Sequence, residues 1–291
     1  MYELIRAGEC SYYLDCPAKI GIYDAGEGVY LIDSGGDRDA GRRARKVLDE
    51  RGWRLLGIVN THSHADHIGG NQYLQRQTGC RVFAPGIEAG FVRAPILEPS
   101  LLYGGCPPAA LRHKFLMAQP SEALPLTDGA FPSGLRAVPL PGHSFEQMGY
   151  ITPDGTAFIA DSVASTATLD KYPFHFIYDA AAYLETLAAL PELDCARFVP
   201  SHAPACEDIR PLAEENIRRT EALGDMVLRL CAQPRTAEEQ LALAFDEAGL
   251  TLDIQQYALS GSTLRSLLTW HQNAGRVTAR IERNRLLWER I

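Results

Sequence analysis

The sequence lacks any apolar run long enough for a membrane-spanning helix, which needs roughly 18 to 20 such residues. Its first residues, "MYELIRAGEC", lack the basic start and apolar stretch that mark a secretory signal peptide. The seven cysteines are odd in number and scattered, and none has Cys-x-x-Cys spacing, as is usual for proteins of a reducing compartment. We therefore expect a cytoplasmic protein with free thiols and no membrane partner.

An excess of positive charge is also absent, since the chain has 28 Lys and Arg against 36 Asp and Glu and a net charge of -8. The exception is the stretch 265–291, which holds six arginines and only two glutamates. Most of the protein therefore has no charge attraction for a polyanion, whereas this tail is able to contact one. An arginine-rich solvated face is the alternative interpretation.

The 291 residues, 46% of them hydrophobic, leave room for one large domain and one smaller one. Short apolar stretches rich in β-branched and aromatic residues alternate with stretches of helical spacing. Strands are predicted within 18–33, 55–61, 135–144, 147–161 and 196–203, and helices at 37–50, 66–79 and 180–190. This order predicts an α/β (α+β) fold in which several strands end at a histidine or an aspartate.

Two later segments depart from this order. Residues 94–120 are rich in proline and apolar residues, which is typical both of a lid beside a site and of a surface excursion with its own small core. After about residue 211 the pattern becomes helical, with a capping box at Thr236 and Glu239 and a final hairpin turning near Arg283–Asn284. We therefore divide the chain into a domain of residues 1–210 and a mostly helical, winged-helix-like region of residues 211–291.

The stretch "NTHSHADHIGG", residues 60–70, places three histidines and an aspartate within six positions. A buried histidine without a partner must lose its charge and leaves two ring nitrogens to satisfy, so a core rarely collects three. In an extended segment His62 and His64 face the same side, while Asp66 and His67 begin the next element and turn toward a neighbouring position. One loop of this kind can serve two metal ions.

The segment "THSHADH" resembles the His-x-His-x-Asp-His signature of the metallo-β-lactamase superfamily, whose fold is a four-layer αββα sandwich. The family's later ligands follow strands, and three residues match them in order: His143 in "PGHS", Asp161 in "IADS" and His202 in "PSHA". The likeness covers about residues 15–205. It implies that His62, His64 and His143 hold one metal, that Asp66, His67 and His202 hold a second, and that Asp161 bridges them. Asp33 resembles the aspartate that supports this site from behind a ligand.

Nitrogen and carboxylate ligands without cysteine suit zinc and also tolerate iron or manganese, so ligand type alone does not name the metal. With the two sites that the resemblance implies, we expect two Zn(II) per chain. Two zinc ions sharing a water lower its pKa and yield a hydroxide able to attack a carbonyl carbon or a phosphorus. Asp66, beside that water, either orients it and takes its proton or acts only as a ligand.

The bridging aspartate and the absence of a cysteine ligand resemble the glyoxalase II and ribonuclease branches of the family more than true β-lactamases. The first functional hypothesis is therefore hydrolysis of a small thioester or ester. Under this hypothesis the 94–120 insertion covers an apolar acyl group, and His175 and Tyr103 are candidate substrate contacts.

Three other hypotheses remain open. A metal-dependent endoribonuclease would use Arg276, Arg280 and Arg283 to contact phosphates, although the acidic remainder of the chain makes nucleic acid the less favoured partner. A mononuclear iron sulfur dioxygenase would keep similar histidines and hold a single iron. In a non-enzymatic role, the tail would bind a partner or act as the arm of a homodimer.

Overall fold

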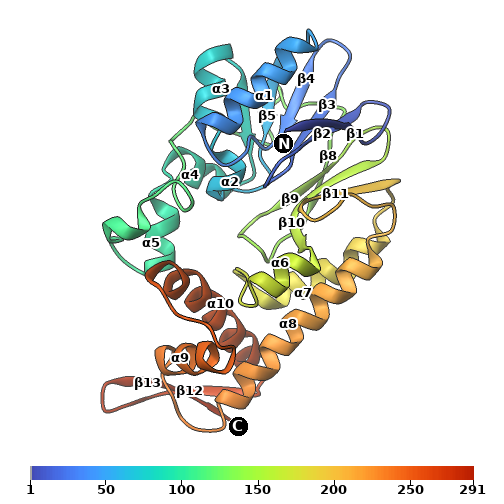
Figure 1. The fold of residues 1–291 in the computed structure, drawn as a ribbon. Coiled ribbons are helices and arrows are strands. Elements are labelled where there is room, and N and C mark those ends of the chain that lie inside the picture. The colour runs from blue at the N-terminus through green and yellow to red at the C-terminus, as the bar shows by residue number, and fades with distance from the viewer. Residues whose placement is uncertain (1) are drawn as a thin grey trace.

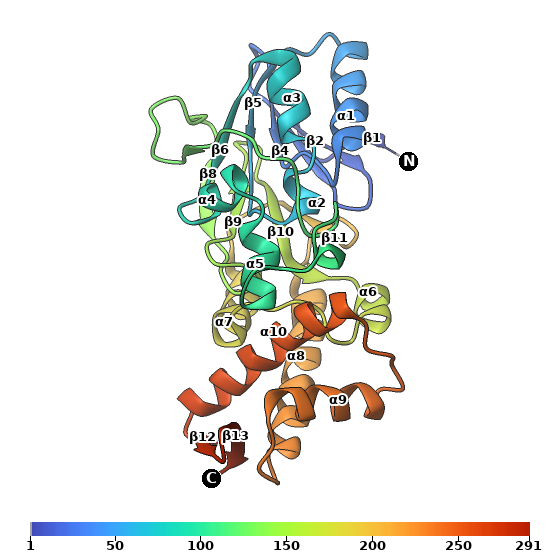
Figure 2. The same ribbon diagram turned by 90° about the vertical axis from the view of Figure 1, so that its left-hand side faces the viewer.

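A computed structural model describes residues 2–291 (Figure 1). Two β-sheets pack face to face, and helices cover the outer face of each sheet (Figures 1 and 2). Between the sheets lies an apolar cluster to which the first sheet contributes Ile32 and Phe83 and the second contributes Tyr150 and Phe158. The four-layer αββα arrangement expected from the sequence is therefore confirmed.

The first sheet has seven strands in chain order, antiparallel from β1 to β4 and parallel from β4 to β7. The strands are β1 (Glu3–Arg6), β2 (Ser11–Asp15), β3 (Ile20–Asp24), β4 (Val29–Ile32), β5 (Leu55–Val59), β6 (Arg81–Ala84) and β7 (Leu124–Pro125). Helix α1 (Arg38–Glu50) covers the outer face of this sheet. Asp37 caps its N-terminus, because the Asp37 side chain accepts hydrogen bonds from two backbone N–H groups of the first turn. The parallel half of the sheet brings the ends of β4 and β5 to one edge, where the histidine loop begins.

The second sheet has the order β11-β10-β9-β8. Its elements and the helices beside it are β8 (Arg136–Pro139), β9 (Met148–Ile151), β10 (Thr156–Ala164), α6 (Thr166–Lys171), α7 (Ala180–Ala189), η2 (Leu190–Glu192) and β11 (Arg197–His202). Strands β9 and β10 form the predicted hairpin, with Gly155 at a φ of 78° in its turn. Strand β11 pairs parallel with β10, so Asp161 and His202 approach the same edge of this sheet.

The predicted single helix at 66–79 is instead two helices, α2 (Ala65–Ile68) and α3 (Asn71–Thr78). The break falls at Gly69 and Gly70, which press against the loop that follows β4. A Cβ added to Gly69 would lie 2.2 Å from the carbonyl carbon of Gly36, and one added to Gly70 would lie 2.4 Å from the Ser34 oxygen. Only glycine permits this approach, which brings the loop after β4 beneath the histidine motif.

The 94–120 insertion and the C-terminal region contain mostly helices. Helix α4 (Glu88–Arg93) lies just before the insertion, and the insertion holds α5 (Leu97–Tyr103) and η1 (Ala109–Leu111). The C-terminal region holds α8 (Arg210–Leu230), α9 (Ala237–Glu247), α10 (Ile254–Asn273), β12 (Val277–Glu282) and β13 (Arg285–Arg290). The predicted capping box at Thr236 and Glu239 and the predicted turn at Arg283–Asn284 are both present. The three helices and the hairpin follow the predicted order, while the likeness to a winged helix stays a prediction.

The C-terminal region shares its core with the second sheet. Helix α8 packs against α7 and β10, and one apolar cluster joins Ile159 and Phe198 of that sheet to Leu223 of α8 and Leu267 of α10. Helix α10 also contacts α5 and η1 of the insertion (Figures 1 and 2). Within residues 2–291, no helix is both long and apolar enough to cross a bilayer.

Candidate metal centre

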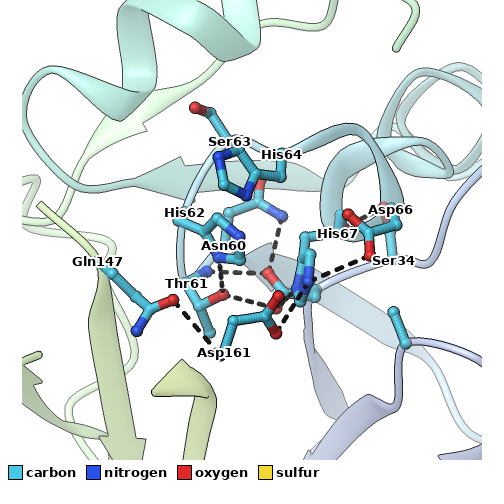
Figure 3. Close-up of polar contacts among 12 residues, drawn as sticks. Ser34, Asn60, Thr61, His62, Ser63, His64, Asp66, His67, Gln147 and Asp161 are labelled. Atoms are coloured by element: carbon cyan, nitrogen blue, oxygen red, sulfur yellow. Dashed lines mark hydrogen bonds and ion pairs between the residues drawn. The ribbon is translucent and has the colours of Figure 1, made fainter. Parts of the chain in front are cut away.

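Two groups of metal-ligating side chains meet where the strands of both sheets end. The ligand atoms of each group lie within 4.8 Å of one another. The first group is His62, His64 and His143, and the second is Asp66, His67, Asp161 and His202. The structure thus brings together all seven residues that the sequence singled out, and Figure 3 shows how those of the histidine motif lie opposite Asp161.

Asp161 lies between the two groups. Its Oδ2 is 3.5 Å from His143 Nε2 and 3.2 Å from His202 Nε2, and its Oδ1 is 3.2 Å from His67 Nε2. The preceding residue, Ala160, has a φ of 50°, and the pairing of β10 with β11 shifts register there. A non-glycine residue in this conformation is strained, and here the irregularity turns Asp161 toward the histidines.

Within residues 2–291, His62 Nε2 is buried without a hydrogen-bond partner, while the buried His67 Nε2 and Asp161 Oδ1 face each other at 3.2 Å as an ion pair. A buried nitrogen without a partner is costly, so His62 Nε2 indicates a missing one. Imidazole nitrogens and carboxylate oxygens directed at one point form the donor set of zinc and similar transition metals. The residues therefore fit a metal in both groups.

The opposite ring nitrogens are held in place by the surrounding chain. His62 Nδ1 lies 3.0 Å from Thr61 Oγ1, and His202 Nδ1 lies 2.9 Å from the backbone oxygen of Pro17. These contacts orient the rings and leave both Nε2 atoms facing the site.

Asp33 contacts the histidine motif from beneath. Its Oδ2 lies 2.8 Å from His67 Nδ1 and accepts a hydrogen bond of 2.7 Å from Thr61 Oγ1, while its Oδ1 accepts one of 2.8 Å from Thr61 N. The side chain is buried, and the backbone has a φ of 64°, which aspartate tolerates better than most residues. One carboxylate therefore sets both the path of the loop and the orientation of the His67 ring.

The first group is electrically neutral without metal. Burial lowers the pKa of His64 to about 4 and that of His143 to about 3, and it lowers the pKa of His62 well below its ordinary value. Because a desolvated imidazolium is costly, these three rings are uncharged at neutral pH, and His143 Nε2 lies 3.0 Å from His64 Nδ1.

The second group consists of ion pairs. Asp161 above all raises the pKa of His202, to about 10. Burial opposes protonation of His67, but Asp161, Asp66 and Asp33 outweigh it and raise the pKa of this ring. A metal entering the second group must therefore displace protons, whereas one entering the first group need not.

Glu88 on α4 is a functional candidate that the sequence did not indicate, since it is a lone acid in an apolar stretch without a motif. It is fully buried and accepts hydrogen bonds from both histidine loops. Its Oε2 accepts from Ser63 N at 3.0 Å and from Ser63 Oγ, and its Oε1 accepts from Ser144 Oγ at 2.7 Å and Glu146 N at 3.1 Å. Because Ser63 separates His62 from His64, and Ser144 follows His143, this carboxylate positions the three histidines of the first group.

A second acid, Glu98 of α5, joins the insertion to the site. Its Oε1 is 3.5 Å from His64 Nε2, and it lines a pocket of about 180 Å³ beside both groups. Burial, and then the charges of Glu88 and Asp66, raise the pKa of Glu98 to about 8. The insertion thus reaches the site through a buried carboxyl.

The two predicted substrate contacts do not line this pocket. Tyr103 ends α5 with 45% of its surface exposed. His175 is packed near Tyr183, and both of its ring nitrogens are buried without a hydrogen-bond partner in the described chain. Their role as substrate contacts stays a prediction, while Phe115 and Leu116 are the apolar side chains that the insertion places at the pocket.

Of the three arginines considered for phosphate contact, two are engaged within the C-terminal region. The guanidinium of Arg276 lies 4.6 Å from the ring centroid of Trp270, and Arg280 pairs with Glu282 and Glu289. Arg283, in the hairpin turn, has no ion pair within residues 2–291. The tail therefore offers less free positive charge than its composition suggests.

The chain belongs to the metallo-beta-lactamase superfamily, which it matches over residues 14–202. A hydroxyacylglutathione hydrolase of Cereibacter sphaeroides is 31% identical over 143 residues, or 49% of this chain and 46% of that protein. The lactamase-like protein adaB of Aspergillus niger is 26% identical over 218 residues, or 73% of this chain and 59% of that protein. The chain thus spans only about half the length of these curated relatives.

Solved structures show the same fold. A beta-lactamase domain protein from Burkholderia ambifaria matches with a TM-score of 0.74 at 19% identity, covering 99% of this chain and 94% of its own. A metallo-beta-lactamase family protein from Thermus thermophilus matches with a TM-score of 0.71 at 20% identity, covering 99% and 98%. Both matches include the C-terminal region.

Proposed function

We propose that this protein is a binuclear metal-dependent hydrolase that acts on a small thioester or ester. The observation that carries the proposal is the pair of adjacent ligand groups, in which Asp161 of the second group lies 3.5 Å from His143 of the first and His62 Nε2 is buried without a partner. Bound zinc ions would supply Lewis-acid polarisation of the substrate carbonyl and a water of lowered pKa. The curated relatives named hydroxyacylglutathione hydrolase favour a thioester as the substrate.

The side chains have separate roles in this proposal. The three histidines of the first group would hold one ion, Asp66, His67 and His202 would hold the other, and Asp161 would serve as a ligand to both. Asp66 is also the candidate that orients the attacking water or takes its proton, because it lies at the edge of the pocket and its side chain is 45% exposed. We also propose a cytoplasmic location, which suits the seven free cysteines.

The first test is the metal content of protein purified without added metal, measured by elemental mass spectrometry. We expect about two zinc per chain, as a binuclear site requires. In His64→Ala and Asp161→Ala, both metal content and hydrolysis of a thioester should fall. Asp225→Ala, an exposed substitution on α8 away from the site, is the control that should leave both unchanged.

Two results would contradict the proposal. Full metal content and activity in both site variants would refute the assignment of the ligands. About one iron per chain would favour the mononuclear sulfur dioxygenase instead.

A further inference from the structure

The pocket beside the metal centre has walls from three parts of the chain. Helix α10 contributes Gln255 and Leu259, the insertion contributes Glu98, Phe115 and Leu116, and the segment before α7 contributes Phe176. The ligand groups contribute the remaining wall. A substrate whose reacting carbon lies at the metal centre would thus extend one of its ends between the insertion and α10.

The apolar part of this wall is held firmly in place. Phe176 lies edge-on to the rings of His64 and His143, with centroid distances of 5.2 and 5.8 Å. Leu116 is buried in a cluster with Leu102, Leu111 and Ala258, and Phe176 and Leu259 pack against that cluster. Contact between the insertion and the C-terminal region therefore shapes the pocket before any substrate enters.

In the described chain, the wall of the pocket beyond the ligand groups has no cation that would neutralise a negative charge. Within residues 2–291, no lysine or arginine lines it, and its polar side chains beyond the ligand groups are Glu98 and Gln255. An anionic group placed against that wall would lose its hydration without gaining a cation there. The pocket therefore suits an uncharged group.

The volume limits the size of that group. An apolar cavity of about 150 Å³ holds one benzene molecule, and this pocket measures about 180 Å³. We propose that the insertion and α10 together form an acyl pocket that selects an uncharged, apolar acyl group no larger than about one phenyl ring. This proposal rests on the hydrolysis proposed above, in which the acyl carbon–sulfur bond breaks and water supplies the new oxygen, leaving a carboxylic acid and a thiol.

A series of thioesters of one neutral thiol, N-acetylcysteamine, tests the selection in the zinc-loaded full chain. Acetyl, butyryl, phenylacetyl, naphthoyl and succinyl groups vary the size and charge of the acyl part alone. We expect kcat/KM to rise about fourfold for each CH₂ that the pocket buries, which follows from about 0.8 kcal/mol per CH₂. It should peak near phenylacetyl and fall for naphthoyl, and succinyl should be at least about tenfold poorer than butyryl, whose chain is of similar length.

Leu259→Trp tests the location, because the larger side chain fills the space opposite Phe176. This variant should lose at least about tenfold in kcat/KM for phenylacetyl but stay within about twofold for acetyl. Leu243→Trp makes the same change on α9 outside the pocket, at a residue that is 37% exposed, and should leave the series unchanged. Equal rates across the acyl series, a preference for succinyl, or equal losses for acetyl and phenylacetyl in Leu259→Trp would overturn the acyl pocket.

A binding measurement separates failure of the pocket from failure of the proposed function. Phenylacetamide, acetamide and succinamate are titrated into metal-free and zinc-loaded protein and followed by ligand-observed NMR. If no thioester is hydrolysed but phenylacetamide binds at least about tenfold tighter than the other two, and Leu259→Trp abolishes this difference, the pocket stands and the hydrolase proposal fails. Indiscriminate binding would overturn the pocket even in an active hydrolase.

Discussion

Replacing Glu88 with glutamine would test how the two histidine loops are held together. The substitution keeps the shape of the side chain but turns one acceptor oxygen into an NH₂ donor. Each oxygen of Glu88 accepts from one hydroxyl and one backbone N–H, which belong to Ser63 on one side and to Ser144 and Glu146 on the other. A hydroxyl can rotate and accept from the new NH₂ group, but a backbone N–H cannot. Either orientation of the amide therefore leaves one backbone N–H without an acceptor, either that of Ser63, whose hydrogen bond is buried, or that of Glu146, whose hydrogen bond is partly buried.

The expected loss of stability follows from this one N–H group that has no acceptor. A buried donor left without a partner costs about 1 to 3 kcal/mol, so Glu88→Gln should lower the free energy of unfolding of the metal-free protein by that amount. Glu88 does not contact the metal position itself and acts through the loops that carry His62, His64 and His143. Loss of a residue that holds metal ligands in place without touching the metal typically weakens metal binding by about 10 to 100-fold.

Urea unfolding of the metal-free protein measures the first quantity, and competition with a zinc chelator measures the second. Glu122→Gln, the same change at an exposed side chain, is the matched control and should alter neither. Ser144→Ala should weaken zinc binding less than Glu88→Gln, because Glu88 keeps its charge and its other three hydrogen bonds and no backbone N–H loses its acceptor. Zinc affinity unchanged in Glu88→Gln, whatever its stability, would refute the positioning role.

Two further predictions concern the charges of the molecule. The pKa of His202 is raised to about 10, so this ring is protonated at neutral pH, whereas the pKa of His64 is lowered to about 4, so that ring is not. Raising the pH from about 6 to about 8 should therefore strengthen metal binding at the second group only. The metal affinity should rise by about one logarithmic unit per pH unit for each proton that the metal displaces. Equal pH dependence of both binding steps in a calorimetric titration would contradict this difference in protonation. For RNA, Arg283→Ala should leave any binding weak and change its salt dependence by at most about one phosphate contact. A steep salt dependence that requires Arg276 and Arg280 would revive the endoribonuclease hypothesis.

The sequence by itself determined the candidate ligand residues, because their positions follow from local structure. The histidine motif lies directly after the buried strand β5, so the alternation of an extended chain and the start of α2 separate His62 and His64 from Asp66 and His67. Strand and turn patterns likewise predicted the elements that carry His143, Asp161 and His202. The capping box at Thr236 and the turn at Arg283–Asn284 depend only on neighbouring residues, and both are present.

Other features were decided by contacts between segments distant in the chain. The helix predicted at 66–79 is broken because Gly69 and Gly70 press against the loop after β4. Glu88 receives hydrogen bonds from residues 25 and 56 positions away, and no local pattern distinguishes it from a solvent-exposed acid. Leu259 reaches the pocket only because α10 packs against the insertion. Local periodicity specifies which face of a helix or strand is apolar, whereas the partner of that face depends on how the whole chain packs. The candidate ligands could therefore be predicted from the sequence, but the residues that form the pocket walls beside them could not.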